Sequence, residues 1–113
     1  RSVANISQTM ARGHHVIAGT DAPIDFVAIS LHLNLRAMTR FGISAADALR
    51  TATAHAGAFL DEPLGVIAPG KLADVLLVCG DPLADVAAAA HVRHIILDGR
   101  ATTPDAIIAP FAG

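Results

Sequence analysis

The sequence predicts an α/β chain in which a helix, a short buried strand and two further helices precede a set of strands joined by turns. Residues 2–12 carry apolar side chains at three- and four-residue steps, the period of a half-buried helix. The apolar run 16–18 has no polar alternation, which favours a strand buried on both faces, as in a parallel sheet. Past residue 60, strand-like runs separated by turn dipeptides replace the helical pattern. We therefore expect a change of architecture near residues 60–65.

Helix signals divide the first part of the chain. Gly13 is expected to end the first helix, and a second helix is expected from residue 27 until Gly42 ends it. Ser44 can cap the next helix, with Asp47 three residues later as the other half of a capping box. The buried stripe of that helix is expected to comprise Leu49, Ala52, Ala56 and Phe59.

The last part of the chain alternates strand and turn signals. Residues 74–79 are rich in Val and Leu and predict a strand, and residues 92–97 predict a second one. Residues 85–90 predict a short turn of helix between them. The Asp-Gly pair at 98–99 is a strong hairpin signal and leads to a third extended run at 100–102.

Composition and charge narrow the function classes. The 113 residues are 53% hydrophobic, and the formal net charge of −2 comes with scattered basic residues, so neither nucleic acid nor an acidic lipid surface is an expected partner. No apolar stretch approaches the roughly 20 residues that span a membrane. The single cysteine, Cys79, cannot form an internal disulfide, and its apolar neighbours predict a reduced, buried thiol. This pattern fits a cytoplasmic protein.

Asp21 is the first candidate functional residue because a carboxylate directly follows the predicted strand 16–18 and its Gly-Thr extension. Aspartate is depleted in strands, so its position needs a reason. In a (β/α)8 barrel the reason is usually catalysis, since active sites are assembled at the carboxyl ends of the strands. The alternative is that Asp21 caps the helix that follows.

Four segments together resemble the C-terminal portion of amidohydrolase-superfamily enzymes, in the imidazolonepropionase-like and prolidase-like branch. They occur in this order: residues 16–23 (VIAGTDAP), 45–53 (AADALRTAT), 64–78 (LGVIAPGKLADVLLV) and 80–86 (GDPLADV). The resemblance implies that residues 1–62 are the C-terminal part of a (β/α)8 TIM barrel, namely its seventh helix, eighth strand and eighth helices. Residues 63–113 would be the C-terminal part of a composite β-sandwich. A complete barrel takes about 250 residues, and the chain starts without Met inside an apparent helix, so we expect a fragment.

The same resemblance implies a metal-dependent hydrolase that acts on carbon–nitrogen bonds other than peptide bonds, or on dipeptides. Its substrate would be a small molecule, either an amide, a cyclic amide or a dipeptide. Its cofactor would be a divalent metal, with zinc as the first choice, bound as one or two ions. Asp21 would be a metal ligand and the proton shuttle. The other ligands would lie outside this chain, which has no His-x-His pair, so the segment alone is not expected to be active. The full-length protein could form a homo-oligomer.

Three further residues are candidates for substrate contacts. Asp25 and Phe26 belong to the loop after Asp21, which would overhang the active-site mouth of a barrel. The alternative for Asp25 is a helix cap. His32 lies eleven positions beyond Asp21 and could face either the cleft or the solvent.

Two other functions stay open. A deaminase of amino-heterocycles would use the same acid and the same activated water at a ring carbon. A split or degenerate chain, without catalysis, would act as a structural or binding partner, and the lack of a His-x-His pair would favour it if 113 residues were the natural length.

Overall fold

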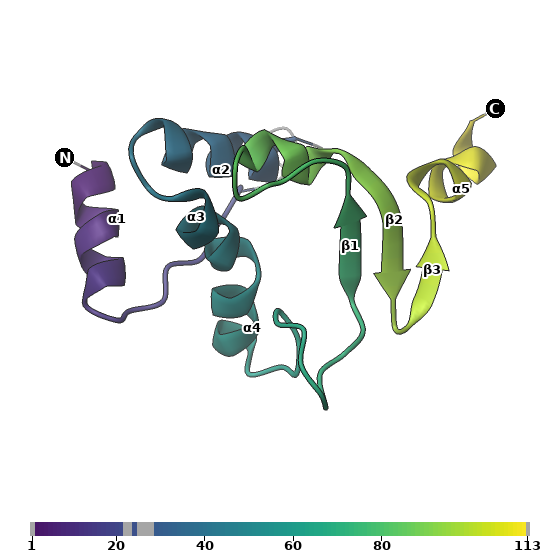
Figure 1. Ribbon diagram of the computed structural model, residues 1–113, viewed down its shortest axis with the longest axis horizontal. Helices are drawn as coiled ribbons and strands as arrows, with labels where there is room; N and C mark the ends of the chain where they lie inside the picture. The colour runs from purple at the N-terminus through teal and green to yellow at the C-terminus, as the bar shows by residue number, and fades with distance from the viewer. Residues whose placement is uncertain (1, 22–23, 25–28, 113) are drawn as a thin grey trace.

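The computed structural model describes residues 2–21, 24 and 29–112 and shows four helices beside a small sheet (Figure 1). In Figure 1 the helices α1 to α4 lie on one side of the sheet, and a short helix, α5, lies beyond its far strand. The helical part comprises α1 (Ser2–Ala11), α2 (Ser30–Arg40), α3 (Ala45–Ala52) and α4 (Ala54–Leu60). The remainder comprises β1 (Val75–Val78), η1 (Val86–Ala90), β2 (Val92–Leu97), β3 (Arg100–Thr102), α5 (Pro104–Ile108) and η2 (Ala109–Phe111). The predicted mixture of helix and strand is therefore confirmed.

Local stop and start signals fix most helix ends. Helix α1 ends at Ala11, and Gly13 adopts a φ of 80°, which a residue without Cβ reaches without steric cost. Ser44 precedes α3 as its N-cap, and its hydroxyl accepts a hydrogen bond from the Asp47 N–H at 3.0 Å. The same hydroxyl donates to the Asp47 carboxylate at 2.7 Å. The predicted cap at Ser44 is confirmed.

This cap makes the stability of α3 depend on pH. The hydrogen bond from Ser44, followed by that from Arg50, holds the pKa of Asp47 below its ordinary value. A lowered pKa in the folded state means that the stabilisation is present above the unfolded pKa of about 3.9 and is lost as the pH falls through the lower folded pKa. We expect Ser44→Ala to cost about 1 kcal/mol at neutral pH. The part of that cost that comes from the bond to the Asp47 carboxylate should shrink below about pH 4.

The measurement is the free energy of unfolding from urea titrations between neutral and acidic pH. Ser7→Ala is the matched control, because Ser7 is exposed on α1. An equal loss in both variants would contradict the assigned cap, and a loss that does not change with pH would contradict the contribution of the bond from Ser44 to the Asp47 carboxylate.

The helix predicted to run from Ser44 to residue 60 is interrupted. Thr53, with φ −128° and ψ −94°, separates α3 from α4, and its hydroxyl donates to the Leu49 carbonyl at 2.9 Å. The break rotates the end of the predicted stripe away from the core, so Phe59 is 71% exposed and its predicted burial is wrong. The chain then returns close to the break, since a Cβ at Gly65 would collide with the Thr53 carbonyl.

Residues 14–20 form no strand within the described part of the chain. Their burial alternates: Val16, Ala18 and Thr20 are half-buried, whereas the intervening residues are exposed. The predicted burial on both faces is therefore wrong, since Ile17 is 37% exposed. A strand needs a hydrogen-bonded neighbour, and the segment's backbone instead bonds to the helices. The (β/α)8 barrel stays a prediction.

The three strands form an antiparallel sheet in the order β1-β2-β3. Asp98 and Gly99 have φ of 49° and 75°, and positive values at both positions are what a tight two-residue hairpin requires. The predicted strands, the hairpin and the helical turn η1 are confirmed. Cys79 is exposed, which corrects the predicted burial, because β1 ends at Val78 and the thiol lies in the connection that follows.

The core lies between the helices and receives one side chain from the second half of the chain. Its buried members are Leu35, Met38, Ile43, Ala48 and Val86. Val86 of η1 thus packs with residues of the predicted barrel part, while the boundary between 1–62 and 63–113 stays a prediction. Within the described ranges, no helix is both long and apolar enough to cross a membrane.

Candidate functional site

Asp21 stands at the end of the extended segment with an unusual backbone conformation. Its side chain is exposed and its φ is 49°, a left-handed value that is uncommon for residues other than glycine. The Ile24 N–H donates to the Asp21 carbonyl at 3.0 Å. Two other described aspartates share the left-handed conformation. Asp61 is the C-cap of α4, and Asp98 lies in the turn of the hairpin. Asp21 likewise begins a turn, since its carbonyl accepts from the N–H three residues later, and left-handed residues also cluster at functional sites.

Three helices hold the segment that leads to Asp21. The Ala18 N–H donates to the Thr51 carbonyl of α3 at 3.1 Å. The Asn34 amide of α2 donates to the Gly19 carbonyl at 2.7 Å. On α4, His55 Nδ1 lies 3.0 Å from the Val16 carbonyl oxygen. A carbonyl oxygen only accepts, so Nδ1 of His55 carries the hydrogen in this bond.

The alternating burial places Asp21 on one face of the segment. Val16, Ala18 and Thr20 contribute their half-buried side chains to one side, while Ile17 and Asp21 are exposed on the other. Successive side chains of an extended chain point to opposite faces. Asp21 leaves the extended conformation at φ 49°, and its side chain is exposed.

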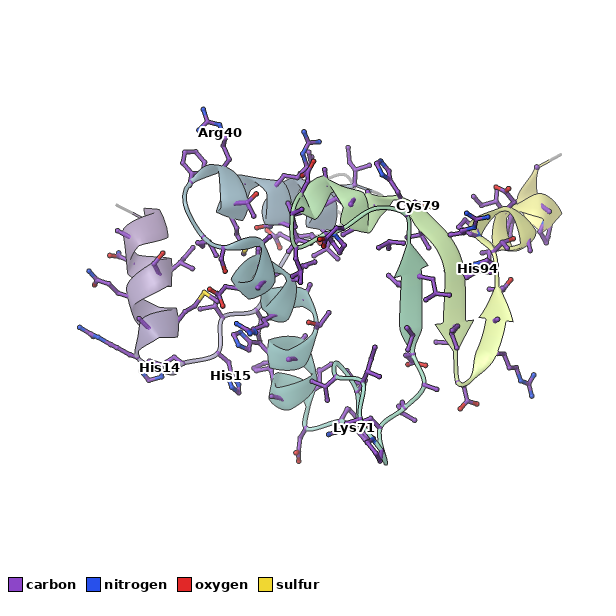
Figure 2. The ribbon with its side chains drawn as sticks, viewed as in Figure 1. His14, His15, Arg40, Lys71, Cys79 and His94 are labelled. Atoms are coloured by element: carbon purple, nitrogen blue, oxygen red, sulfur yellow. The ribbon has the colours of Figure 1, made fainter. Side chains whose placement is uncertain are left out.

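The histidines do not converge on Asp21. Figure 2 shows His14 and His15 on the connection after α1, and His94 on the sheet at the other side of the molecule. The ring of His15 stacks on that of His55, with centroids 4.8 Å apart and planes inclined by 17°. His32 is half-buried on α2.

The described residues do not form a complete site for the expected metal. They contain no group of three or more His, Cys, Asp or Glu side chains that could hold an ion. A catalytic zinc takes about three protein ligands, and a carboxylate oxygen is a suitable donor. Asp21 thus fits as one donor of a larger set and is insufficient by itself. Asp25 and Phe26, the other predicted substrate contacts, lie outside the described residues.

Two hollows of the described chain are lined by residues other than Asp21. One, of about 540 Å³, is lined by α2 and by Asp85 and Val86 at the start of η1. Another, of about 510 Å³, is apolar and lies between α3, α4 and β1. Asp21 is not among the residues that line these two hollows.

Comparison with known protein families shows to which family the chain belongs. The model of the amidohydrolase family matches residues 1–102. The chain belongs to the amidohydrolase family. The family membership predicted from the four sequence segments is therefore confirmed. Among curated proteins, no significant match to this amidohydrolase chain was found.

Solved structures agree with the family assignment. A Xaa-Pro dipeptidase with methionine bound in its active site superposes with a TM-score of 0.75 and 28% identity, over 89% of this chain and 25% of its own. A molinate hydrolase superposes with a TM-score of 0.78 and 24% sequence identity, over 97% of this chain and 27% of its own. An amidohydrolase from Thermotoga maritima MSB8 superposes with a TM-score of 0.71 and 22% sequence identity, over 88% of this chain and 26% of its own. The last two likenesses show the fold alone. The chain spans about a quarter of the length of each.

Two residues that position the segment were missed by sequence reasoning. Asn34 and His55 both lie inside helices, and the local sequence around them does not indicate that they bond to the segment before Asp21. Their bonds reach back 15 and 39 residues along the chain. Only the polar character of Asn34 between Leu33 and the buried Leu35 could have drawn attention to it.

Proposed function

We propose that this amidohydrolase segment belongs to a larger metal-dependent enzyme that hydrolyses carbon–nitrogen bonds of small molecules, with Asp21 as its acid and base. The observation that carries the proposal is the left-handed, exposed Asp21 at the end of a segment held by three helices. The likeness to a Xaa-Pro dipeptidase at 28% identity supports a dipeptide or a similar amide as the substrate class. The (β/α)8 barrel and the composite β-sandwich form part of this proposal.

Asp21 would move one proton between two atoms. Its carboxylate accepts a proton from the water that attacks the carbonyl carbon, as a positioned general base does. The tetrahedral species then collapses, the carbon–nitrogen bond breaks, and Asp21 returns the proton to the leaving nitrogen. The products are a carboxylic acid and an amine, and Asp21 ends as it began. A carboxylate serves here because it can accept and release a proton without leaving its position.

A divalent metal, with zinc as the first choice, would supply acidification of the water and polarisation of the carbonyl oxygen. Asp21 would contribute one oxygen ligand from this chain, and the remaining ligands would come from other parts of the protein. We further propose Asp25, Phe26 and His32 as substrate contacts. His32 is the only one of the three that lies in the described residues, where it is half-buried on α2.

The test is a substrate panel with the complete protein, containing Xaa-Pro and other dipeptides, N-acyl amides, cyclic amides and amino-heterocycles. We expect release of amine and acid from one of the first three classes. Removal of the metal by a chelator should abolish turnover and added zinc should restore it. Replacement of a ring amino group by oxygen would instead assign a deaminase. No turnover of any class in the metal-loaded protein would contradict the proposal.

A further inference from the structure

Gly19 lies just before the acid and has no side chain to restrain its conformation. It lies two residues before Asp21, and a Cβ at this position would meet nothing within 4 Å. Packing among the described residues therefore does not restrain it. Glycine also has access to more φ/ψ space than any other residue. Some other interaction must fix its orientation if Asp21 is to keep one position.

Asn34 provides that interaction. Its amide donates to the Gly19 carbonyl at 2.7 Å. The hydrogen bonds from the helices to Val16 and Ala18 lie further from Asp21 along the chain. Among the described residues, the bond from Asn34 is thus the last one to a helix before the acid. The hydrogen bond from Ile24 to the Asp21 carbonyl is local and does not connect the turn to a helix.

The helix that carries Asn34 is firmly anchored. Leu35 and Met38 of α2 are 3% and 8% exposed and belong to the core. The hydrogen bond from Asn34 therefore fixes the Gly19 carbonyl relative to a helix that is packed in the core. The donor side of the bond to Gly19 is therefore ordered by the packing of α2 in the core.

We propose that Asn34 is a positioning residue that sets the location of the Asp21 carboxylate through the Gly19 carbonyl. The inference rests on the proposed role of Asp21. In this proposal Asn34 acts through the Gly19 carbonyl, to which its amide donates, and not through contact with the substrate or the metal. Its loss should reduce the chemical step and leave substrate binding largely unchanged, because a carboxylate displaced by about 1 Å can cost up to 100-fold in rate.

The experiment compares Asn34→Ala and Asn34→Asp with Asn5→Ala in the complete enzyme. Asn5 is the matched control because it is exposed on α1. We expect Asn34→Ala to lower kcat by about tenfold or more, with little change in KM and in the unfolding midpoint. Asn5→Ala should leave all three unchanged.

The Asn34→Asp variant distinguishes a role of Asn34 in positioning Asp21 from a role in stabilising the fold. Aspartate has the same shape as asparagine, but its ionised form cannot donate a hydrogen bond to a carbonyl, whereas its protonated form can. The kcat of this variant, divided by that of the wild type at each pH, should therefore rise as the pH falls toward about 4. The same ratio for Asn34→Ala should stay flat.

Three results would overturn the inference. In the first, Asn34→Ala keeps kcat within twofold of the wild type while Asp21→Asn is inactive. In the second, the two Asn34 variants show the same pH-independent loss, which assigns a structural role only. In the third, Asp21→Asn turns over at the wild-type rate, which removes the proposed function and this inference together.

Discussion

Asp21→Asn is expected to lower kcat of the complete enzyme by about 100- to 10,000-fold, the range lost when a general base is removed. Asparagine has the shape of aspartate and tolerates the left-handed backbone at φ 49°. Its amide oxygen cannot take up the proton of the attacking water. The measurement is steady-state turnover on the substrate that the panel identifies, with the bound metal counted in the same preparation.

Asp61→Asn and Asp98→Asn are the matched controls. Both residues are exposed aspartates in the left-handed conformation, with φ of 54° and 49°. They lie at a helix end and in a hairpin, where they have no proposed part in catalysis. We expect kcat of both controls to match the wild type. If Asp21→Asn kept kcat within a few-fold of the wild type, with its metal and fold intact, Asp21 would have no place in the mechanism.

Expressed by itself, the 113-residue chain is expected to self-associate or to unfold without a sharp transition. Its described core is small, whereas many large apolar side chains are exposed, such as Ile67 at 89% and Phe111 at 84%. Strands β1 and β3 are both edges of the sheet, and unpaired edges promote association between chains. Light scattering after gel filtration and a thermal melt would measure both properties.

A variant with charge on the exposed apolar positions provides the control. Ile67→Lys together with Phe111→Lys should shift the chain toward monomer if apolar contact drives the association. A substitution such as Arg93→Lys, on the exposed side of β2, should leave it unchanged. A monomeric wild-type chain with one sharp, cooperative transition would show that these 113 residues fold by themselves and would contradict the expectation.

The elements that the sequence predicted correctly depend on short-range chemistry. The Asp-Gly pair at 98–99 requires positive φ at both positions, and the structure has it. Ser44 caps α3 through a residue only three positions away. The strands 92–97 and 100–102 have the predicted bounds, because turn residues delimit them. Each of these structures is determined by residues that lie only a few positions apart in the sequence.

The features that sequence reasoning missed depend on distant residues. The break at Thr53 turned Phe59 outward, and no Gly or Pro marks the break. Cys79 is exposed because β1 ends one residue earlier. The bonds from Asn34 and His55 to the segment before Asp21 join residues 15 and 39 positions apart. The role of Asp21 itself was predicted from its place after an apolar run, and it stays a prediction.

The most direct test of the central claim is the intact mass of the native polypeptide, with bound metal counted in the same sample. The chain spans about a quarter of each solved relative, so we expect a mass about four times 11.6 kDa, with zinc or a similar divalent metal bound. A native polypeptide of 11.6 kDa without metal would contradict the account. The metal-dependent hydrolase would then have to be replaced by a non-catalytic partner chain.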